Sequence, residues 1–195
     1  MSLKNQLTKS DYLPLDEFMK LLQGLHKDKQ YIWELYARLS FCTALRASDV
    51  LSLTWADVLN KSMLIKREQK TGKVRKISFN PQTQQEITSL YKLLGTPNPA
   101  QLIFYSKYTH KPFSIQHINH IIKEWKKKYK INIGNFSTHT FRKTFGRYVY
   151  DISDNKSEAL ILINSILRHS NIDTTKIYIG LRDDEIQSVF NSISI

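Results

Sequence analysis

Apolar residues recur at spacings of three and four along most of this chain, a pattern that places them on one face of an α-helix. The segments with this helical spacing are 15–25, 28–42, 47–53, 81–94, 114–129, 138–150, 157–167, 174–179 and 183–193. One segment differs: MLIKREQ, KTGK and VRKISF, within 63–79, indicate a strand, a turn with a glycine and a second strand. We expect a mainly α (α+β) fold, a helical domain with a small antiparallel β-sheet.

Size and charge narrow the class of protein. The 195 residues suit a flexible N-terminal segment, 1–13, and one domain, 14–195. The formal net charge of +12 points to an anionic partner, nucleic acid first and a membrane surface second. No apolar run is long enough for a membrane span, and no signal peptide follows Met1, so we expect a cytoplasmic protein. Cys42, the only cysteine, excludes an internal disulfide and a cysteine-based zinc site.

The segment FSTHTFRKTFGRYVY places His139 and Arg142 three residues apart. On a helix these two side chains share a face, with Phe141, Phe145 and Val149 turned inward. A guanidinium grips two oxygens of a phosphate, and an imidazole adds a donor or moves a proton. Taken alone, the motif is more often an exposed polar face with a satisfied histidine.

Arg46 and Asp49 stand in ALRASDVL, where a turn meets a helix. Asp49 falls one helical turn after Arg46 and is expected to hold Arg46 or His139 in place. Leu45 and Val50 would anchor the turn on the core. An ordinary ion pair at a helix start is the alternative for this segment alone.

The hairpin carries a concentration of basic residues. KTGK is not a phosphate-binding P-loop, which needs a second glycine and a following helix. A basic hairpin can enter a groove of duplex DNA, while lysines also protect exposed sheet edges. The basic side chains of the hairpin are Lys66, Arg67, Lys70, Lys73, Arg75 and Lys76.

The segment SILRHSNIDTTKIY places His169 nine residues before Tyr178. This spacing has two explanations: a helix cap followed by a packed aromatic residue, or a histidine and a tyrosine of an active site. Together with the three preceding segments, it resembles the tyrosine recombinase (phage integrase) family. TALRASDVLSLTW is similar to the first arginine box, EQKTGKVRKISF to the hairpin with the catalytic lysine, STHTFRKTFGRYV to the HxxR box, and ILRHSNIDTTKIY to the segment with the nucleophile. The four occur in family order over 43–178.

The resemblance implies how a phosphate is bound. Arg46 and Arg142 would clamp the scissile phosphate of DNA, and His139 and His169 would donate to its oxygens or assist proton transfer. Asp49 would orient the site. Fixed cationic donors oppose the negative charge that builds on the nonbridging oxygens during attack.

The resemblance also implies the chemical step. Tyr178 would attack to give a 3′-phosphotyrosyl link, and Lys70 would protonate the leaving 5′ oxygen, with Lys73 only three residues away as the other lysine. Surrounding cations are expected to favour the tyrosine phenolate. The covalent link conserves bond energy, so rejoining needs no ATP. No metal or other cofactor is expected, because the carboxylates do not cluster.

The chain departs from the family pattern at three positions. Arg168 stands where glycine is usual, so it would disturb the helix end or add a phosphate contact. Lys143 replaces a common second histidine and is counted among the DNA contacts. Ala44 replaces the glycine before Leu-Arg.

The resemblance implies a site-specific recombinase of bacterial or mobile-element origin that acts in integration, excision or inversion. These outcomes differ in the arrangement of sites and not in the chemistry. The partners would be double-stranded DNA and further copies of the chain, from dimer to tetramer, and no membrane. The family's N-terminal core-binding domain is expected to be absent. The alternatives are a catalytically silent integrase-like DNA-binding module, a type IB topoisomerase-like enzyme and, more remotely, a ribonuclease.

Three remaining features carry weaker signals. His117 and His120 have a metal-ligand spacing, but no cysteine or carboxylate partner is evident. KEWKKKYK, at 123–130, is a solvated helix end or a phosphate-backbone contact. The apolar face of 183–193 would pack on its own domain or reach into a neighbour.

Overall fold

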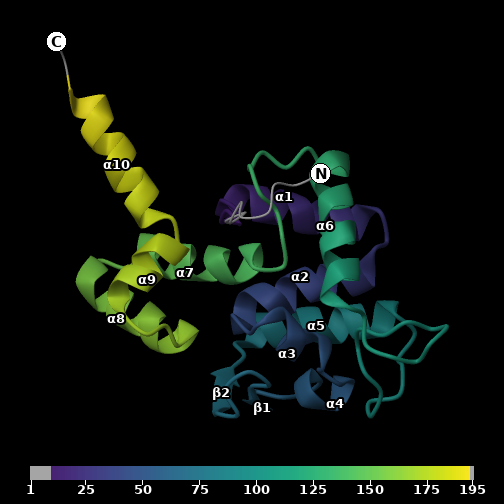
Figure 1. Cartoon of the computed structure of the whole chain (residues 1–195). Coiled ribbons are helices and arrows are strands. Elements are labelled where there is room, and N and C mark those ends of the chain that lie inside the picture. Colours follow the sequence, from purple (N-terminus) through teal and green to yellow (C-terminus); the bar gives the residue numbers. More distant parts are fainter. Residues whose placement is uncertain (1–9, 194–195) are drawn as a thin grey trace.

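The structure, a computed structural model, describes residues 10–193, apart from the side chains of residues 182 and 183. Its helices and strands confirm a mainly helical domain with a two-stranded antiparallel sheet (Figure 1). The elements are α1 (Leu15–Lys27), α2 (Tyr31–Thr43), α3 (Ala47–Leu51), α4 (Trp55–Val58), β1 (Met63–Arg67), β2 (Val74–Ser78), α5 (Pro81–Leu93), α6 (Ile115–Lys128), α7 (Thr140–Ile152), α8 (Lys156–Leu167), α9 (Ile172–Tyr178) and α10 (Leu181–Ser192).

The main core is built around α2, which is covered by α1, α5 and α7. Tyr36 is fully buried, and its ring meets Phe104 and Phe141 edge-on at centroid distances of 5.4 and 6.1 Å. Such edge-to-face pairs are favourable beyond the apolar area that they bury. Because Phe141 lies at the start of α7, this packing fixes the helix that also carries Arg142.

A second, smaller core joins α7, α8 and α9. Ile163, Leu167 and Ile179 are fully buried there, and Phe145 and Val149 of α7 pack against them. Gly146 allows the close approach of α7: a β-carbon at this position would lie 2.7 Å from the Ile179 side chain. Helix α7 therefore contributes to both cores, and its first turn lies at their junction.

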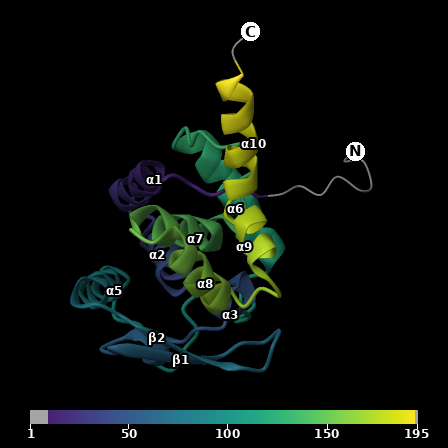
Figure 2. The ribbon, with the colours of Figure 1, turned by 90° about the vertical axis from the view of Figure 1, so that its left-hand side faces the viewer.

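The hairpin pairs Met63 with Ser78 and Arg67 with Val74. Its turn contains Gly72 at φ 67°, a conformation that glycine adopts without penalty. The residues of each strand alternate between buried or partly buried and exposed. In Figure 2 the hairpin lies below α3 and α8, at one end of the molecule.

Some boundaries differ from the sequence-based expectation. The second helix begins at Tyr31 rather than residue 28, and α4 was not expected, because four residues are too few to show a helical period. Within the segment expected to be flexible, Leu13 is buried and its backbone N–H donates to Thr144 Oγ1 at 2.8 Å. Residues 1–9 of that segment lie outside the described residues.

Helix α10 projects away from the body in both views (Figures 1 and 2). Its apolar side chains Ile186, Val189 and Phe190 are 49–65% exposed, so the chain's own domain does not cover this face. No helix within residues 10–193 is long and apolar enough to cross a membrane.

Candidate active site

Arg46 emerges from a tight turn between α2 and α3. Ala44 adopts a left-handed conformation, with φ 47° and ψ 30°, where the family pattern has glycine. Leu45 is buried and its backbone N–H donates to Thr43 Oγ1, which itself donates to Leu39 O at 2.6 Å. The turn is therefore rigid, and it delivers Arg46 as the residue preceding α3.

Arg142 joins this turn to the end of α8. Its guanidinium donates to the carbonyl oxygens of Ala44 and, at 2.6 Å, Leu167. Burial lowers its pKa to about 10, and the charges of Arg46 and Arg75 act in the same direction. An arginine held this way keeps its charge at neutral pH and has little freedom to reorient, as a preorganised phosphate site requires.

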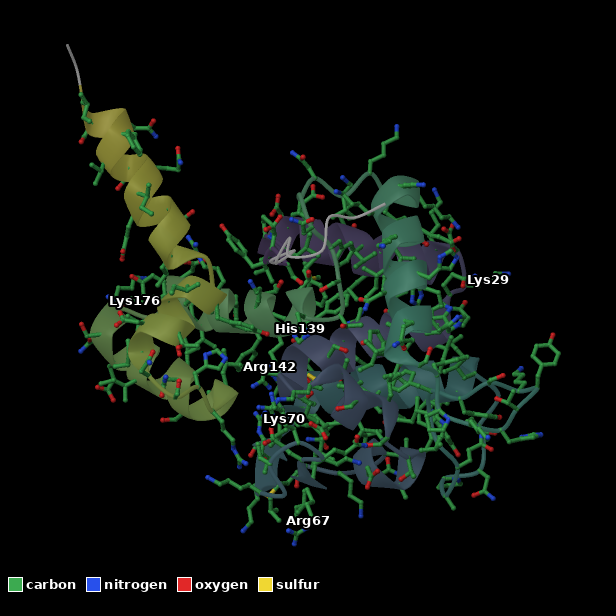
Figure 3. The ribbon with its side chains drawn as sticks, viewed as in Figure 1. Lys29, Arg67, Lys70, His139, Arg142 and Lys176 are labelled. Carbon is green, nitrogen blue, oxygen red and sulfur yellow. The ribbon has the colours of Figure 1, made fainter. Side chains whose placement is uncertain are left out.

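His139 lies at the start of α7, one turn before Arg142. Partial burial lowers its pKa, followed by the charges of Arg142, Lys143, Arg46 and Lys70. The imidazole is therefore neutral at pH 7. Figure 3 shows Lys70, Arg142 and His139 one above another, along the junction between the α7–α9 helices and the rest of the body.

His169 is fixed by a hydrogen-bonded chain that starts at Asn164. The Asn164 amide donates to Thr175 Oγ1 at 3.0 Å, and Thr175 Oγ1 shares a hydrogen bond with His169 Nδ1, also at 3.0 Å. Burial, with the charges of Arg142 and Arg46, lowers the pKa of His169 to about 4. The ring is therefore neutral at pH 7, and when the Thr175 hydroxyl donates to Nδ1, the ring proton lies on Nε2, which is then a donor.

Tyr178 ends α9 beside these groups. Its ring meets the His169 ring edge-on at 4.8 Å, and Lys143 Nζ lies 5.0 Å from its centroid. Burial raises the pKa of the phenol, against the lowering effects of Arg142 and Arg46. The arginines favour the phenolate, as expected, but desolvation of the hydroxyl outweighs them, so the pKa lies above its ordinary value.

Lys70 is exposed in the hairpin turn, and the backbone beside it is anchored by Asp49. The carboxylate of Asp49 is fully buried, and its Oδ1 accepts from the Gln69 backbone N–H at 2.8 Å. The sequence suggested that Asp49 would hold Arg46 or His139. It instead fixes the hairpin, because the side chain of a residue in the first turn of α3 faces the strand end.

Glu68 is the functional residue that the sequence-based reasoning missed. Its carboxylate is fully buried at the end of β1 and forms ion pairs with Arg168, Arg46 and Arg75 at 3.0, 3.3 and 3.5 Å. Burial raises its pKa, but the hydrogen bond from Thr71 and the three guanidinium charges together bring it below the usual range. Glu68 follows Leu64 and Lys66 at alternate positions, and this strand period would have placed it on the inner face.

The predicted DNA contacts of the hairpin divide into two groups. The expectation that Arg75 contacts DNA is wrong, because its side chain is only 9% exposed. It donates to Thr43 O and Ala44 O and so supports the Arg46 turn from inside. Lys66 is partly buried and donates to Ser52 O at 3.0 Å. Arg67, Lys73 and Lys76 are exposed, as a groove-binding surface requires. Lys143 is also buried, over the Tyr178 ring.

Unsatisfied polar atoms gather at this site. Within residues 10–193, the buried atoms without a hydrogen bond of regular geometry include Asp49 Oδ2 and Tyr178 Oη, the latter with Arg142 nearby, and also Arg46 Nη1 and Glu68 Oε1, which are in ion pairs at 3.3 and 3.5 Å. Buried polar groups in native structures are almost always satisfied, so such a concentration marks a place where a ligand completes the bonding. Arginine and histidine donors around a tyrosine hydroxyl suit a phosphodiester.

The histidine pair on α6 does not form a second site. His120 pairs with Glu124 at 3.4 Å, and the His117 ring packs on Phe113. Glu124 is a carboxylate partner that the sequence-based reasoning overlooked. The described part of the chain contains no group of three or more side chains placed to bind a metal ion.

Comparisons with known proteins agree with this chemistry. A family model described as Phage integrase family matches residues 11–185. The probable integrase/recombinase YoeC of Bacillus subtilis (strain 168) is 32% identical over 178 residues, 88% of this chain and 93% of that protein. The tyrosine recombinase XerC of Vibrio atlanticus (strain LGP32) is 25% identical over 171 residues, 87% of this chain but only 54% of its own length. The chain thus spans nearly all of one relative and about half of the other.

Solved structures share the fold at lower identity. The XerA recombinase matches 92% of this chain and 64% of its own chain, with a TM-score of 0.69 and 24% identity. A XerH site-specific recombinase bound to difH substrate matches 92% of this chain and 53% of its own, with a TM-score of 0.66 and 17% identity. A lambda integrase dimer bound to a COC′ core site matches 92% and 62%, with a TM-score of 0.63 and 17% identity.

Proposed function

Because the chain belongs to the phage integrase family, we propose that it is a site-specific tyrosine recombinase that cuts and rejoins DNA through a 3′-phosphotyrosyl intermediate. Residues 14–195 form its catalytic domain. The observation that carries the proposal is that Arg142 and Arg46 lie close enough to Tyr178 to lower its pKa, while the His169 ring packs edge-on against the Tyr178 ring and His139 lies one turn before Arg142.

Phosphate binding is the first step. Arg46 and Arg142 contact the nonbridging oxygens, and the Nε2–H of His169 donates to one of them. His139, neutral at pH 7, is able to accept the phenol proton of Tyr178. The phosphate would add a partner for the buried hydroxyl of Tyr178 and a second anion for Arg46, which already pairs with Glu68 at 3.3 Å.

Strand cleavage follows by displacement at phosphorus. Tyr178 Oη forms a bond to phosphorus as the bond to the 5′ oxygen breaks, and Lys70 Nζ gives a proton to that oxygen. The raised pKa of Tyr178 keeps its hydroxyl protonated until DNA binds. A phosphate bound between Tyr178 and the arginines then orients the attack. The reverse reaction, with a 5′ hydroxyl from another strand, rejoins the DNA without ATP.

The partners follow from the chemistry and from the relatives. Relatives in the family are described as bound to DNA, one of them as a dimer, and double-stranded DNA with self-association into dimers and tetramers is proposed for this chain. The exposed apolar face of α10 is available for contact with another copy. The cytoplasm of a bacterium, where such DNA is found, is the proposed location.

A nicked duplex provides the test. Oligonucleotide duplexes captured covalently by the wild-type protein from a random-sequence pool identify a target. A nick close to the cleavage position then lets the short 5′-hydroxyl fragment diffuse away, which traps the covalent adduct. We expect an adduct with the wild-type protein and none with Tyr178→Phe.

Two controls separate the alternatives. Tyr150→Phe removes the hydroxyl of a neighbouring tyrosine of the second core and should leave the adduct unchanged. A wild-type protein that binds the selected duplex and never forms an adduct would favour the catalytically silent DNA-binding module. No observation on the described residues favours that module, since all six proposed catalytic side chains are present.

A further inference from the structure

Glu68 and Arg168 have no role in the chemical steps above, yet they form a buried contact beside the site. Arg168 Nη1 lies 3.0 Å from Glu68 Oε2, the shortest of the three ion pairs of this carboxylate. The contact joins residues 100 positions apart: one at the root of the hairpin turn and the other directly before His169.

The backbone of Arg168 indicates that the side chain is held for a reason. Arg168 ends α8 in the left-handed conformation, with φ 53° and ψ 49°, which disfavours every residue that has a β-carbon. Glycine is the residue that such helix ends usually use. The contacts of the Arg168 side chain therefore have to offset the cost of this backbone conformation.

The side chain of Arg168 spans the hairpin turn. Nη1 donates to Glu68 Oε2 at 3.0 Å and to Thr71 Oγ1 at 3.4 Å, and Nη2 donates to Val74 O at 3.0 Å. Thr71 Oγ1 in turn donates to Glu68 Oε2 at 2.8 Å. One guanidinium thus fixes both sides of the turn, 68–74, to the end of α8.

Lys70 lies between two anchored neighbours. On one side, the Gln69 backbone is held by Asp49 at 2.8 Å, and on the other, the Thr71 hydroxyl is held by Glu68 and Arg168. Lys70 is exposed, so the position of its ammonium is determined by its backbone and not by packing of its side chain. Without one of these contacts, the turn would be free to move, and the ammonium of Lys70 would no longer be held within hydrogen-bond distance of the leaving oxygen.

We propose that Arg168 is a positioning residue that fixes the hairpin turn against the segment with His169 and Tyr178, so that Lys70 reaches the leaving 5′ oxygen. The inference rests on the proposed function. Loss of Arg168 should therefore impair the proton transfer to the leaving group and spare phosphate binding and the attack by Tyr178.

The test compares two nicked duplexes that differ in one atom. The first has the normal 5′ oxygen at the scissile phosphate, and the second has sulfur in its place. A thiol has a pKa of about 8.5, far below that of an alcohol, so the sulfur leaves as a thiolate without a donated proton. Single-turnover rates of adduct formation are measured at saturating protein for each duplex.

Arg168→Gly is the informative variant, because glycine suits the left-handed helix end and removes only the side chain. On the oxygen duplex we expect its rate to fall about 10- to 100-fold, and that of Lys70→Ala by about 10²- to 10⁴-fold, the usual contribution of a general acid. On the sulfur duplex both variants should recover to within about threefold of the wild type. Thr71→Val should show a smaller loss of the same kind.

Arg38→Ala is the matched control. Arg38 is 27% exposed and pairs with the buried carboxylate of Glu34, much as Arg168, 24% exposed, pairs with Glu68. The control loses a comparable ion pair in α2 and should keep the wild-type rate on both duplexes.

The possible failures are distinguishable. An equal loss for Arg168→Gly on both duplexes, or no loss on the oxygen duplex, would overturn the positioning role while leaving the recombinase proposal intact. Absence of any adduct with the wild-type protein on both duplexes would overturn the proposed function, and with it the inference.

Discussion

Substitution of Glu68 by glutamine tests the electrostatic centre of the site. The amide keeps the shape of the side chain and removes its charge, leaving three guanidinium groups without their shared counter-ion. Breaking a buried ion pair costs about 3–5 kcal/mol. Arg75 is 9% exposed, but Arg46 and Arg168 are 22% and 24% exposed, so water screens part of the loss. We expect the free energy of unfolding at pH 7 to fall by about 2–3 kcal/mol.

The loss should depend on pH in a defined direction. The folded-state pKa of Glu68 is lowered relative to that of an unfolded glutamate, whose ordinary value is about 4.3. Its charge therefore contributes stability that is fully present above about pH 4.3 and is lost as pH falls through the folded pKa. The difference between wild type and Glu68→Gln should be constant from pH 7 to about pH 5 and shrink below about pH 4.3.

Urea unfolding followed by circular dichroism provides the assay, on wild type, Glu68→Gln and the control Glu86→Gln. Glu86 is 36% exposed and pairs with Arg38 at 3.2 Å, so its substitution should cost no more than about 1 kcal/mol. At about 2–4 °C per kcal/mol for a chain of this size, the melting temperature of Glu68→Gln should fall by about 4–12 °C. A loss at pH 7 no larger than that of the control, or a difference that persists unchanged at low pH, would refute the reasoning.

Three further predictions concern single contacts. Thr175→Val removes the hydroxyl bonded to His169 Nδ1 and should slow single-turnover cleavage about tenfold while leaving DNA affinity unchanged in a filter-binding assay, because the ring loses the hydrogen bond that orients it. Lys73→Ala should reduce the slope of log K against log salt by about one, whereas Arg75→Ala should lower the melting temperature, because only Lys73 is exposed. Gly146→Ala forces a methyl group into the second core and should destabilise the fold by about 1–3 kcal/mol in urea unfolding.

The periodicity of the sequence predicted the long elements well, for a physical reason. Helices such as α1 and α6 bury one face, so their apolar residues repeat with the helical turn. The hairpin was predicted from its turn glycine and flanking strands. Helix α4 lacked such a signal because it has four residues, and its ends are defined by a capping box between Thr54 and Asp57.

The roles of the charged residues were harder to predict, because charge alone does not say which face a side chain occupies. Arg75 was assigned to DNA with the other basic residues of the hairpin, although it shares the inner face with Ile77 and Phe79 by the strand period of two. Arg168 stood out as a departure from the usual glycine, but nothing in the local sequence indicated its partners. Its contacts lie near residues 68–74, and only the tertiary fold brings the two segments together.

The central claim is that Tyr178 is the nucleophile, and its covalent product can be located directly. After nuclease digestion of the trapped adduct, proteolysis and tandem mass spectrometry assign the residue that carries the remaining 3′-linked nucleotide. We expect the modification on Tyr178, within the peptide that also contains Thr175. A nucleotide on any other residue, or an adduct that persists in Tyr178→Phe, would contradict the account.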